Sequence, residues 1–349
     1  MEINPNGSKA PYYIGNFLYN ARMYDKAIGY WERSAELDDN FPTVLRNLSL
    51  AYYNKRNEPE KAVGMLEKAF ALDNSDSRIL MELDQLYKKM RKPHKERLAF
   101  LEQHIEAALQ RDDIYVEMVT LHNQLGDFAR AAELIKSRKF HPWEGGEGKI
   151  TSQFLISRLE LAKIAIGQAR YEEAIALLKE TVKYPDNLGE GKLSGAEEND
   201  IHYYMGCAYE GRGDQAKATE YFEKATTGSK EPAIAFFYND HQPDKIFYQG
   251  LALEKLGRKE EAQKRYNSLI AHGQEHIDDN VKISFFAVSL PELLIWDEDL
   301  KIRNLIHCNL VMGMGHLGLG EKAVAAEYFD KVLELDINHQ GAAALRKLC

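Results

Sequence analysis

The chain has 349 residues, of which 44% are hydrophobic and 28% are charged, proportions typical of a folded protein. Its formal net charge of −9 at pH 7 argues against nucleic acid as a partner, because phosphate binding requires clustered Lys and Arg. No segment approaches the ~20 apolar residues that cross a bilayer, so we expect no membrane partner. The first residues lack a signal-peptide pattern and the three cysteines are widely separated, two features that favour a cytoplasmic location.

Alanine recurs along the chain at intervals that a repeating unit of about 34 residues explains. Seven alanines, separated by 35, 69, 43, 44, 44 and 63 residues, keep this spacing: Ala27, Ala62, Ala131, Ala174, Ala218, Ala262 and Ala325. Self-similarity on this scale predicts a solenoid, in which each unit is a pair of amphipathic helices packed on its neighbours. The repeat predicts the architecture, but it does not identify a ligand.

The first part of the chain contains four predicted units, at residues 8–41, 42–76, 77–110 and 111–139. The first helix of a unit carries a small residue, such as Gly15. The second helix carries an alanine and, four residues later, a bulky side chain, such as Ala27 and Trp31. Two helices can cross closely only where one side of the contact is small. The third unit departs from the pattern, because Glu96 or Arg97 stands where the alanine is expected.

Four further units follow, at residues 155–185, 199–232, 243–273 and 306–339, and residues 342–349 are predicted to form one extra capping helix. In several units a glycine follows the first helix. We expect these glycines to adopt the left-handed conformation that ends a helix. They are Gly126, Gly213, Gly257 and Gly320.

Residues in excess of the repeat gather in four insertions, at about 140–154, 185–198, 232–244 and 274–305. Each follows the second helix of a unit, so all four are predicted to emerge on one edge of the solenoid, where repeat proteins commonly bind partners. The last insertion is too apolar for a free linker. We expect it to pack on the array, with a short helix opening near Pro291.

At these spacings the residues resemble the tetratricopeptide repeat (TPR) over nearly the whole chain. The resemblance implies an all-α fold, a right-handed α-solenoid of about eight helix pairs with inserted loops on one edge. It divides the chain into N-terminal units (1–139), middle units (155–273) and a last unit with its capping helix (306–349), with the insertions 140–154 and 274–305 between them. Residues 3–7 fit the closing positions of a preceding unit, so we expect the chain to begin inside a longer array.

A closer resemblance involves the insertions. Residues 140–149, 285–291, 297–300 and 303–307 are similar to the C-terminal TPR region of large bacterial proteins. Those proteins carry an N-terminal domain of unknown function, of the β-sandwich kind seen in sugar-processing enzymes. The resemblance implies that this chain is the helical half of such a protein.

Two of the insertions share the string Pro-x-x-x-Gly-Glu-Gly-Lys, at residues 142–149 and 185–192. Its glycines allow positive φ angles and expose backbone N–H groups. Such loops act either as structural plugs between helices or as ligand contacts, and a loop tryptophan either stacks on a sugar ring or anchors its own loop. The rim-loop candidates are His141, Trp143, Glu144, Glu147, Lys149, Glu190 and Lys192.

Motifs for catalysis or cofactors are weak. Residues 313–318 spell G-x-G-x-x-G, but they lie within a predicted helix rather than after a strand. His272 and His276 can meet on one helix face, although they lack the H-E-x-x-H arrangement of zinc sites. We therefore predict no catalytic residue, no cofactor and no metal site.

The concave surface of the array is predicted to be lined by exposed positions of the first helices. Tyr and Asn there suit an extended peptide, through stacking and side-chain amide bonds to its backbone, or alternatively they only solvate the groove. The groove candidates are Tyr12, Asn16, Tyr19, Asn20, Arg46, Tyr53, Asn54, Tyr203 and Glu210.

These features predict a non-catalytic scaffold that binds a peptide, a protein or another domain of the same parent chain. The alternative is an accessory part of a larger glycan-processing enzyme, whose rim loops contribute to a carbohydrate site. A third hypothesis is a homodimer formed through the apolar N-terminal face.

Overall fold

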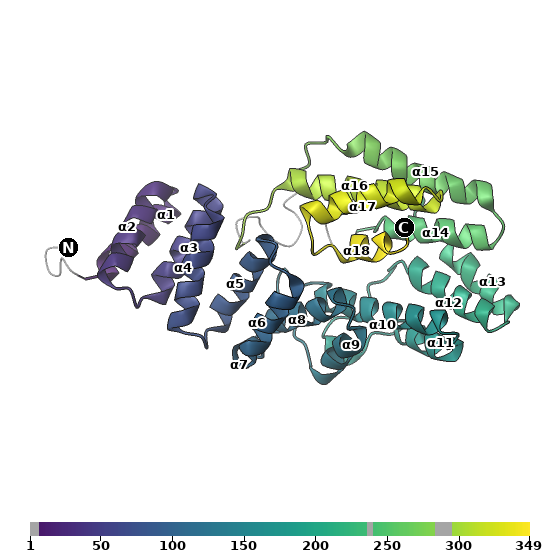
Figure 1. Ribbon diagram of the computed structural model, residues 1–349, viewed down its shortest axis with the longest axis horizontal. Coiled ribbons are helices and arrows are strands. Elements are labelled where there is room, and N and C mark those ends of the chain that lie inside the picture. Colours follow the sequence, from purple (N-terminus) through teal and green to yellow (C-terminus); the bar gives the residue numbers. More distant parts are fainter. Residues whose placement is uncertain (1–6, 236–239, 283–294) are drawn as a thin grey trace. The chain divides into compact units, whose positions relative to one another are not determined.

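The computed structural model describes residues 7–235, 240–282 and 295–349, which form eighteen α-helices, one short 3-10 helix and no β-strand. The chain divides into two compact units. Unit 1 contains Met1–Leu121 together with Ser289–Glu298, and unit 2 contains His122–Val288 together with Asp299–Cys349. Consecutive helices pack in pairs (Figure 1). The predicted all-α fold built from helix pairs is confirmed.

Unit 1 consists of three helix pairs and most of the following helix. Its helices are α1 (Lys9–Asn20), α2 (Tyr24–Leu37), α3 (Pro42–Arg56), α4 (Pro59–Leu72), α5 (Ser77–Lys89), α6 (His94–Gln103), α7 (Ile105–Ala108) and α8 (Asp112–Gln124), whose last turn belongs to unit 2. Proline opens α3 and α4, where its missing N–H costs no helical hydrogen bond. Asp76 caps α5, because its carboxylate accepts hydrogen bonds from the N–H groups of Arg78 and Ile79.

Unit 2 contains the remaining helices. They are α9 (Phe128–Ser137), α10 (Lys149–Gly167), α11 (Tyr171–Glu180), the 3-10 helix η1 (Asp186–Leu188), α12 (Asn199–Gly211), α13 (Gln215–Ala225), α14 (Asp244–Lys255), α15 (Lys259–His276), α16 (Leu300–Gly318), α17 (Lys322–Leu335) and α18 (Gln340–Arg346). None of the described helices is long and apolar enough to cross a membrane.

Two helices of unit 2 begin earlier than the sequence predicted. Helix α10 begins at Lys149, six residues before the predicted unit, and α16 begins at Leu300 rather than at residue 306. The carboxylate of Asp299 caps α16 by accepting hydrogen bonds from the first backbone N–H groups. Parts of two predicted insertions are therefore helical. The helix predicted near Pro291 lies outside the described residues.

The predicted packing rule is confirmed at the alanines and at the small residues. All seven recurring alanines are at most 1% exposed. A methyl group added to Gly206 would lie 2.4 Å from the ring of Phe222, and one added to Gly250 would lie 2.2 Å from the ring of Tyr266. The bulky residue four positions after the alanine thus fills the space that the glycine leaves.

The turn within each helix pair contains one left-handed residue. The four predicted glycines have φ angles of 83, 90, 77 and 79°: Gly126, Gly213, Gly257 and Gly320. The other four pairs place a non-glycine residue there, with φ between 53 and 60°: Arg22, Asn57, Arg91 and Ala169. The turn geometry is therefore a property of the repeat, and glycine is the residue that adopts it without steric strain.

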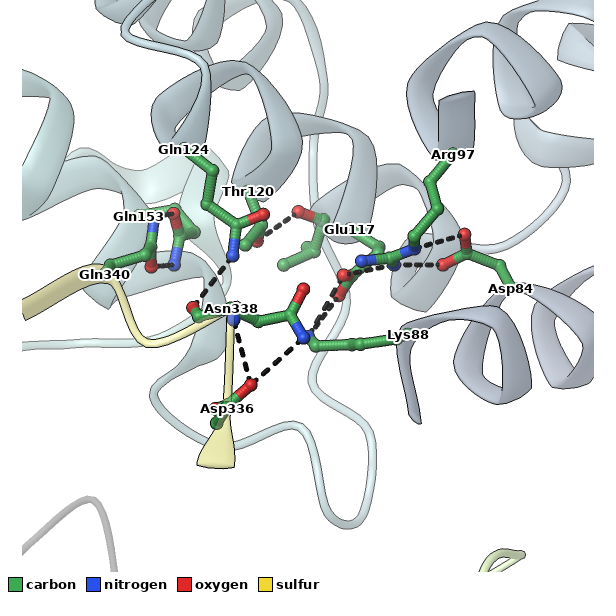
Figure 2. Close-up of polar contacts among 11 residues, drawn as sticks. Asp84, Lys88, Arg97, Glu117, Thr120, Gln124, Gln153, Asp336, Asn338 and Gln340 are labelled. Carbon is green, nitrogen blue, oxygen red and sulfur yellow. Dashed lines mark hydrogen bonds and ion pairs between the residues drawn. The ribbon is translucent and has the colours of Figure 1, made fainter. Parts of the chain in front are cut away.

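The third helix pair replaces the small contact by an ion pair. Asp84 holds the position of the small residue in α5, and Arg97 holds the position of the alanine in α6. Arg97 is fully buried and binds Asp84 in a fork, through hydrogen bonds of 3.0 and 2.6 Å (Figure 2). Its guanidinium also binds Glu117 of α8 at 2.7 Å.

The pKa values of the two acids in this cluster, Asp84 and Glu117, shift in opposite directions. Burial raises the pKa of Asp84 against the pull of Arg97. Burial also opposes the ionisation of Glu117, but the charges of Lys88 and Arg97 outweigh it and lower the pKa of Glu117. The fully buried guanidinium thus lies between two carboxylates, and Lys88 also pairs with the one on Glu117.

Within unit 2, residues far apart in the sequence are joined by side-chain amides. The carboxamide of Gln124 donates to the carbonyl of Asn338 at 2.9 Å, and Gln153 of α10 binds Gln340 of α18 at 3.0 Å (Figure 2). The helix α18 corresponds to the predicted extra helix. Its contacts bring the end of unit 2 against its first helices.

Candidate functional site

A short segment of the chain lies against α3 in unit 1 and is held by one asparagine. The carboxamide of Asn54 donates to the carbonyl of Ile295 at 2.8 Å and accepts from the N–H of Asp297 at 2.9 Å. This reciprocal pair fixes which end of the carboxamide is oxygen and which is nitrogen, because the flipped group would oppose donor to donor. Asn54 therefore hydrogen-bonds to the backbone on both sides of Trp296.

Between those two backbone bonds, Trp296 enters the core of unit 1. Its side chain is 3% exposed and joins the apolar cluster formed by α2 to α8. The ring of Tyr53 meets it edge to face, with 5.2 Å between the ring centroids. Such an aromatic pair contributes about 1 kcal/mol beyond the burial of apolar area.

The residue after Trp296, Asp297, adds charged contacts with two lysines of unit 1. Its carboxylate pairs with Lys55 of α3 at 3.0 Å, and its backbone carbonyl accepts from Lys89 of α5 at 3.4 Å. Burial opposes the charge of Lys55, but the hydrogen bond and the charge of Asp297 outweigh it and raise the pKa of Lys55. Since the Asp297 side chain is 54% exposed, the pair contributes more to selectivity than to stability.

Unit 1 also contains a small pocket. It has a volume of about 280 Å³ and is lined by residues of α1, α2 and α3: Asn16, Tyr19, Asn20, Trp31, Asn47 and Leu50. Burial raises the pKa of Tyr19, and the charge of Asp297 adds to the effect. The ring of Tyr19 also meets that of Tyr24 at 5.0 Å, and the ammonium group of Lys55 lies 5.4 Å from the centre of the Tyr24 ring.

We call this surface the unit 1 groove. It comprises the pocket together with Tyr53, Asn54, Lys55 and Lys89. Five of the predicted groove residues belong to it: Asn16, Tyr19, Asn20, Tyr53 and Asn54. Sequence reasoning did not select Lys55 and Lys89, although both follow the aromatic and amide positions of their helices. It also did not identify residues 295–297 as the segment that the groove holds.

The remaining groove candidates have structural partners. Tyr12 packs on Phe41, with 4.9 Å between the ring centroids. The guanidinium of Arg46 forms two 2.5 Å hydrogen bonds with the carboxylate of Glu82, which is fully buried. These contacts tie neighbouring helices of unit 1 together.

Two groove candidates lie in unit 2 and not in the unit 1 groove. Tyr203 packs against Tyr204 and Tyr248, and burial raises its pKa. Glu210 pairs with Lys255 at 2.6 Å. The predicted groove residues are thus divided between the two units.

The two rim loops, residues 140–148 and 185–191, pack on each other in unit 2. The N–H of Phe140 donates to the carbonyl of Asn187 at 2.8 Å, and the N–H of Gly148 donates to the carboxylate of Glu190 at 2.9 Å. Burial raises the pKa of Glu190 despite that hydrogen bond. Glu190 therefore joins one loop to the other, as the structural interpretation of the loops predicts.

The repeated string does not give the two loops one backbone conformation. Gly148 is left-handed in the first loop, whereas Gly189 is left-handed in the second, and these are not equivalent positions of the string. The backbone of Phe140 also packs closely on Gly189, where an added methyl group would lie 2.5 Å from the carbonyl oxygen of Phe140.

The other rim-loop candidates have mixed positions. The ring of Trp143 covers Gly146, where an added methyl group would lie 2.0 Å from it. Lys192 pairs with Glu198 at 2.5 Å. Glu147 is half-buried, and the remaining three side chains are exposed: His141, Glu144 and Lys149.

Histidines also cluster in unit 2. The rings of His272 and His276 are 4.5 Å apart, as their spacing on one helix suggested, and His307 lies 5.8 Å from His272. Among the described residues no group of three or more His, Cys, Asp or Glu side chains is arranged to hold a metal ion. The Nε2 atoms of His272 and His307 are buried without a hydrogen-bond partner in that part of the chain.

A pocket in unit 2 was not anticipated from the sequence. It measures about 580 Å³ and lies between α9, α10 and the loop after α11, over apolar side chains that include Ile135, Phe154 and Pro185. Arg158 and Glu180 pair at 3.0 Å on its wall. Its residues come from the second helix of one repeat and from the first helix and inserted loop of the next, so no single repeat pattern indicates them.

Comparison with known proteins identifies a repeat family in two parts of the chain. Residues 159–232 and residues 246–272 each match a family model described as tetratricopeptide repeat. A TPR protein, YrrB, described as having an unusual peptide-binding site, is similar at 16% identity, with 64% of this chain and 87% of that chain covered and a TM-score of 0.34. A tetratricopeptide repeat protein from Parabacteroides merdae shares 12% identity over 74% of this chain and 91% of that chain, with a TM-score of 0.41.

The TPR2AB-domain:pHSP90 complex of yeast Sti1 is also similar, at 14% identity over 98% of this chain and 95% of that chain, with a TM-score of 0.33. The helix pairs, the buried alanines and the left-handed turns agree with the matched family. Residues 159–232 and 246–272 are therefore tetratricopeptide repeats.

Proposed function

We propose that this protein is a non-catalytic interaction scaffold that binds an extended peptide segment of a partner in the unit 1 groove. The observation that carries the proposal is the pair of hydrogen bonds from Asn54 to the backbone of residues 295–297. Such bonds recognise an extended chain whatever its side chains are, and pockets beside them supply selectivity.

The groove offers the hydrogen-bonding, aromatic and charged groups that suit binding of a peptide. Asn54 offers one donor and one acceptor, Tyr53 offers an aromatic edge, and Lys55 and Lys89 offer positive charge. The pocket of about 280 Å³ adds side-chain amides at Asn16, Asn20 and Asn47, which suit further backbone or polar contacts. The partner is a separate protein, a peptide, or another domain of a longer parent chain.

The rim loops do not support a second proposal for carbohydrate. The ring of Trp143 lies on Gly146 of its own loop, and Glu190 is engaged by the backbone of Gly148. Both contacts favour loops that hold each other in place.

The proposal is tested by selecting peptides from a displayed random library on the full chain. Because Asn54 also holds residues 295–297, isothermal titration then compares the selected peptides on two chains that both carry Asp297→Lys, one with Asn54 unchanged and one with Asn54→Ala. We expect Asn54→Ala to weaken binding about tenfold or more, since two hydrogen bonds of about 0.5–1.5 kcal/mol each are lost. Asn74→Ala, at an exposed asparagine in the turn after α4, serves as the matched control and should leave the affinity unchanged. Selected peptides that bind equally well to Asn54→Ala would contradict the proposal.

A further inference from the structure

We propose that residues 295–297 are an internal ligand of the unit 1 groove, and that the partner is an extended peptide in which a large aromatic residue is followed directly by an acidic one. The inference rests on the proposed function and deepens it, because it names the chemistry of the partner and a competitor within the chain. It is carried by the way the segment is held: two backbone bonds, one buried ring and one paired carboxylate.

The backbone bonds make the groove a site for competition. Asn54 binds the carbonyl of residue 295 and the N–H of residue 297 through its only donor group and its only acceptor group. A partner backbone of the same extended shape needs the same two groups, so the internal segment and the partner cannot be bound together. A segment packed only through side chains would not exclude a partner in this way.

The buried ring defines the first side chain of the partner. Trp296 is 3% exposed within the core of unit 1, but its Nε1 is buried with no hydrogen-bond partner among the described residues. The site therefore binds the ring through its apolar surface and its edge-to-face contact with Tyr53. Among the described residues the indole N–H has no hydrogen-bond acceptor. Phenylalanine at this place fits without that unsatisfied donor.

Positive charge defines the second side chain. Lys55 pairs with the carboxylate of Asp297 at 3.0 Å, and Lys89 lies at the carbonyl of the same residue at 3.4 Å. The two ammonium groups come from α3 and α5, so an acidic residue directly after the aromatic one meets both helices. A basic residue there is repelled by both, which gives the groove a means of rejecting the wrong sequence.

Occupation by the internal segment lowers the apparent affinity for a partner. The apparent dissociation constant is the intrinsic one divided by the fraction of molecules whose groove is open. If the segment occupies the groove in more than about 90% of molecules, a partner binds about tenfold or more weakly than to an open groove. Weakening the segment without changing the groove should therefore strengthen binding in trans.

The experiment uses a fluorescein-labelled synthetic peptide, Leu-Leu-Ile-Trp-Asp-Glu-Asp, which is the sequence of residues 293–299. Fluorescence anisotropy measures its affinity for the full chain and for two variants, Trp296→Ala and Asp297→Lys. We expect both variants to bind the peptide about tenfold or more tightly than the unchanged protein. Trp143→Ala, which removes a tryptophan from a loop of unit 2, is the matched control and should bind as the unchanged protein does.

Asp297→Lys guards against misfolding, because it leaves the Trp296 side chain unchanged and reverses only a charge that is 54% exposed. Thermal melting by circular dichroism identifies any variant that fails to fold. Adding Asn54→Ala to Asp297→Lys should remove the gain in affinity. Probe peptides in which the Trp is replaced by Ala, or the first Asp by Lys, should bind at least tenfold more weakly than the parent peptide.

Equal affinity of the unchanged protein and of Asp297→Lys for the probe would overturn internal occupation of the groove. Equal binding of the parent and substituted probes would overturn the aromatic–acidic chemistry. Either result is separate from failure of the proposed function, which is decided by whether library-selected peptides depend on Asn54.

Discussion

Arg97 stands where most helix pairs have a buried alanine, and it is fully buried. We expect Arg97→Ala to destabilise the protein by about 3–5 kcal/mol, because it leaves Asp84 buried without its partner. The double variant Asp84→Ser with Arg97→Ala should recover most of that loss. It recreates the second pair, where Ser49 and Ala62 hold these positions and Ser49 Oγ donates to the carbonyl of Ala62 at 2.7 Å.

Urea unfolding at pH 7 measures the three proteins. If the double variant is as unstable as Arg97→Ala alone, the ion pair does more than replace a small–small contact, and the equivalence between the pairs is wrong.

His307 gives unit 2 a sensitivity to acid. Burial lowers the pKa of His307 to about 4, and the positive charges of His272, His276 and His339 add to the effect. The unfolded chain therefore takes up a proton below pH ~6.5, the ordinary histidine pKa, while the folded chain does so only near pH 4. The stability due to His307 is full above pH ~6.5 and is lost as the pH falls through 4, by about 3 kcal/mol in total.

Urea unfolding at pH values from 7.5 to 4 checks this expectation. His307→Gln, which cannot titrate, should lose less stability over that range than the unchanged protein. His141→Gln, at an exposed histidine, should behave as the unchanged protein does. Parallel loss of stability in the protein and in His307→Gln would show that other groups govern the acid response.

Helix pairing depends on glycine where a neighbouring side chain or backbone fills the space of its missing methyl group. Gly206→Ala should destabilise the protein by about 1–3 kcal/mol, because the added methyl would lie 2.4 Å from the buried ring of Phe222. Gly64→Ala is the matched control in α4: no atom lies within 4 Å of its added methyl, and alanine is the better helix former by about 1 kcal/mol. Thermal melting should thus move in opposite directions for the two variants, and a shift in the same direction would contradict the packing rule.

The two rim loops offer a second matched pair. Gly189→Ala should lower the melting temperature, since its φ is 72° and its methyl group would lie 2.5 Å from the carbonyl oxygen of Phe140. Gly191→Ala, two residues later and with open space around it, should change the melting temperature little. If the two variants melt alike, the loops do not hold each other as the structure describes.

Regular features of the helix pairs were predictable from the sequence because they recur. The spacing of the alanines and of the four turn glycines predicts their positions in the helix pairs. The bulky residue four places after each alanine follows from helix geometry. The Asp84–Arg97 pair was visible only as a break in that spacing. When two charged residues stand where a unit normally has small residues, the sequence does not show whether their side chains are exposed or paired. Burial depends on the tertiary structure.

The candidate site was predictable in part for the same reason. Tyr53 and Asn54 are half-buried residues of a first helix, and the periodicity predicts that they lie on the concave side. Their contact with Ile295, Trp296 and Asp297 joins residues about 240 positions apart, as in the hydrogen bond between Asn54 and Ile295. No repeat links the two segments, so only the folded chain shows that they meet. The predicted residues Tyr203 and Glu210 fell in unit 2 because the pattern does not mark where one compact unit ends.

The chain divides into two compact units, and residues 295–298, which precede α16 of unit 2, belong to unit 1. That stretch carries the contact with Asn54. The unit 1 groove thus contains a segment from a distant part of the same chain, and a partner peptide must compete with it.

The most direct measurement of this account is residue-resolved amide hydrogen exchange at Asp297, whose N–H donates to Asn54 at 2.9 Å. We predict that this amide exchanges about tenfold or more slowly than in an unstructured peptide, and that Asn54→Ala removes the protection while the amides of α1 keep theirs. Exchange of the Asp297 amide at the free-peptide rate in the unchanged protein would show that the groove does not hold residues 295–297.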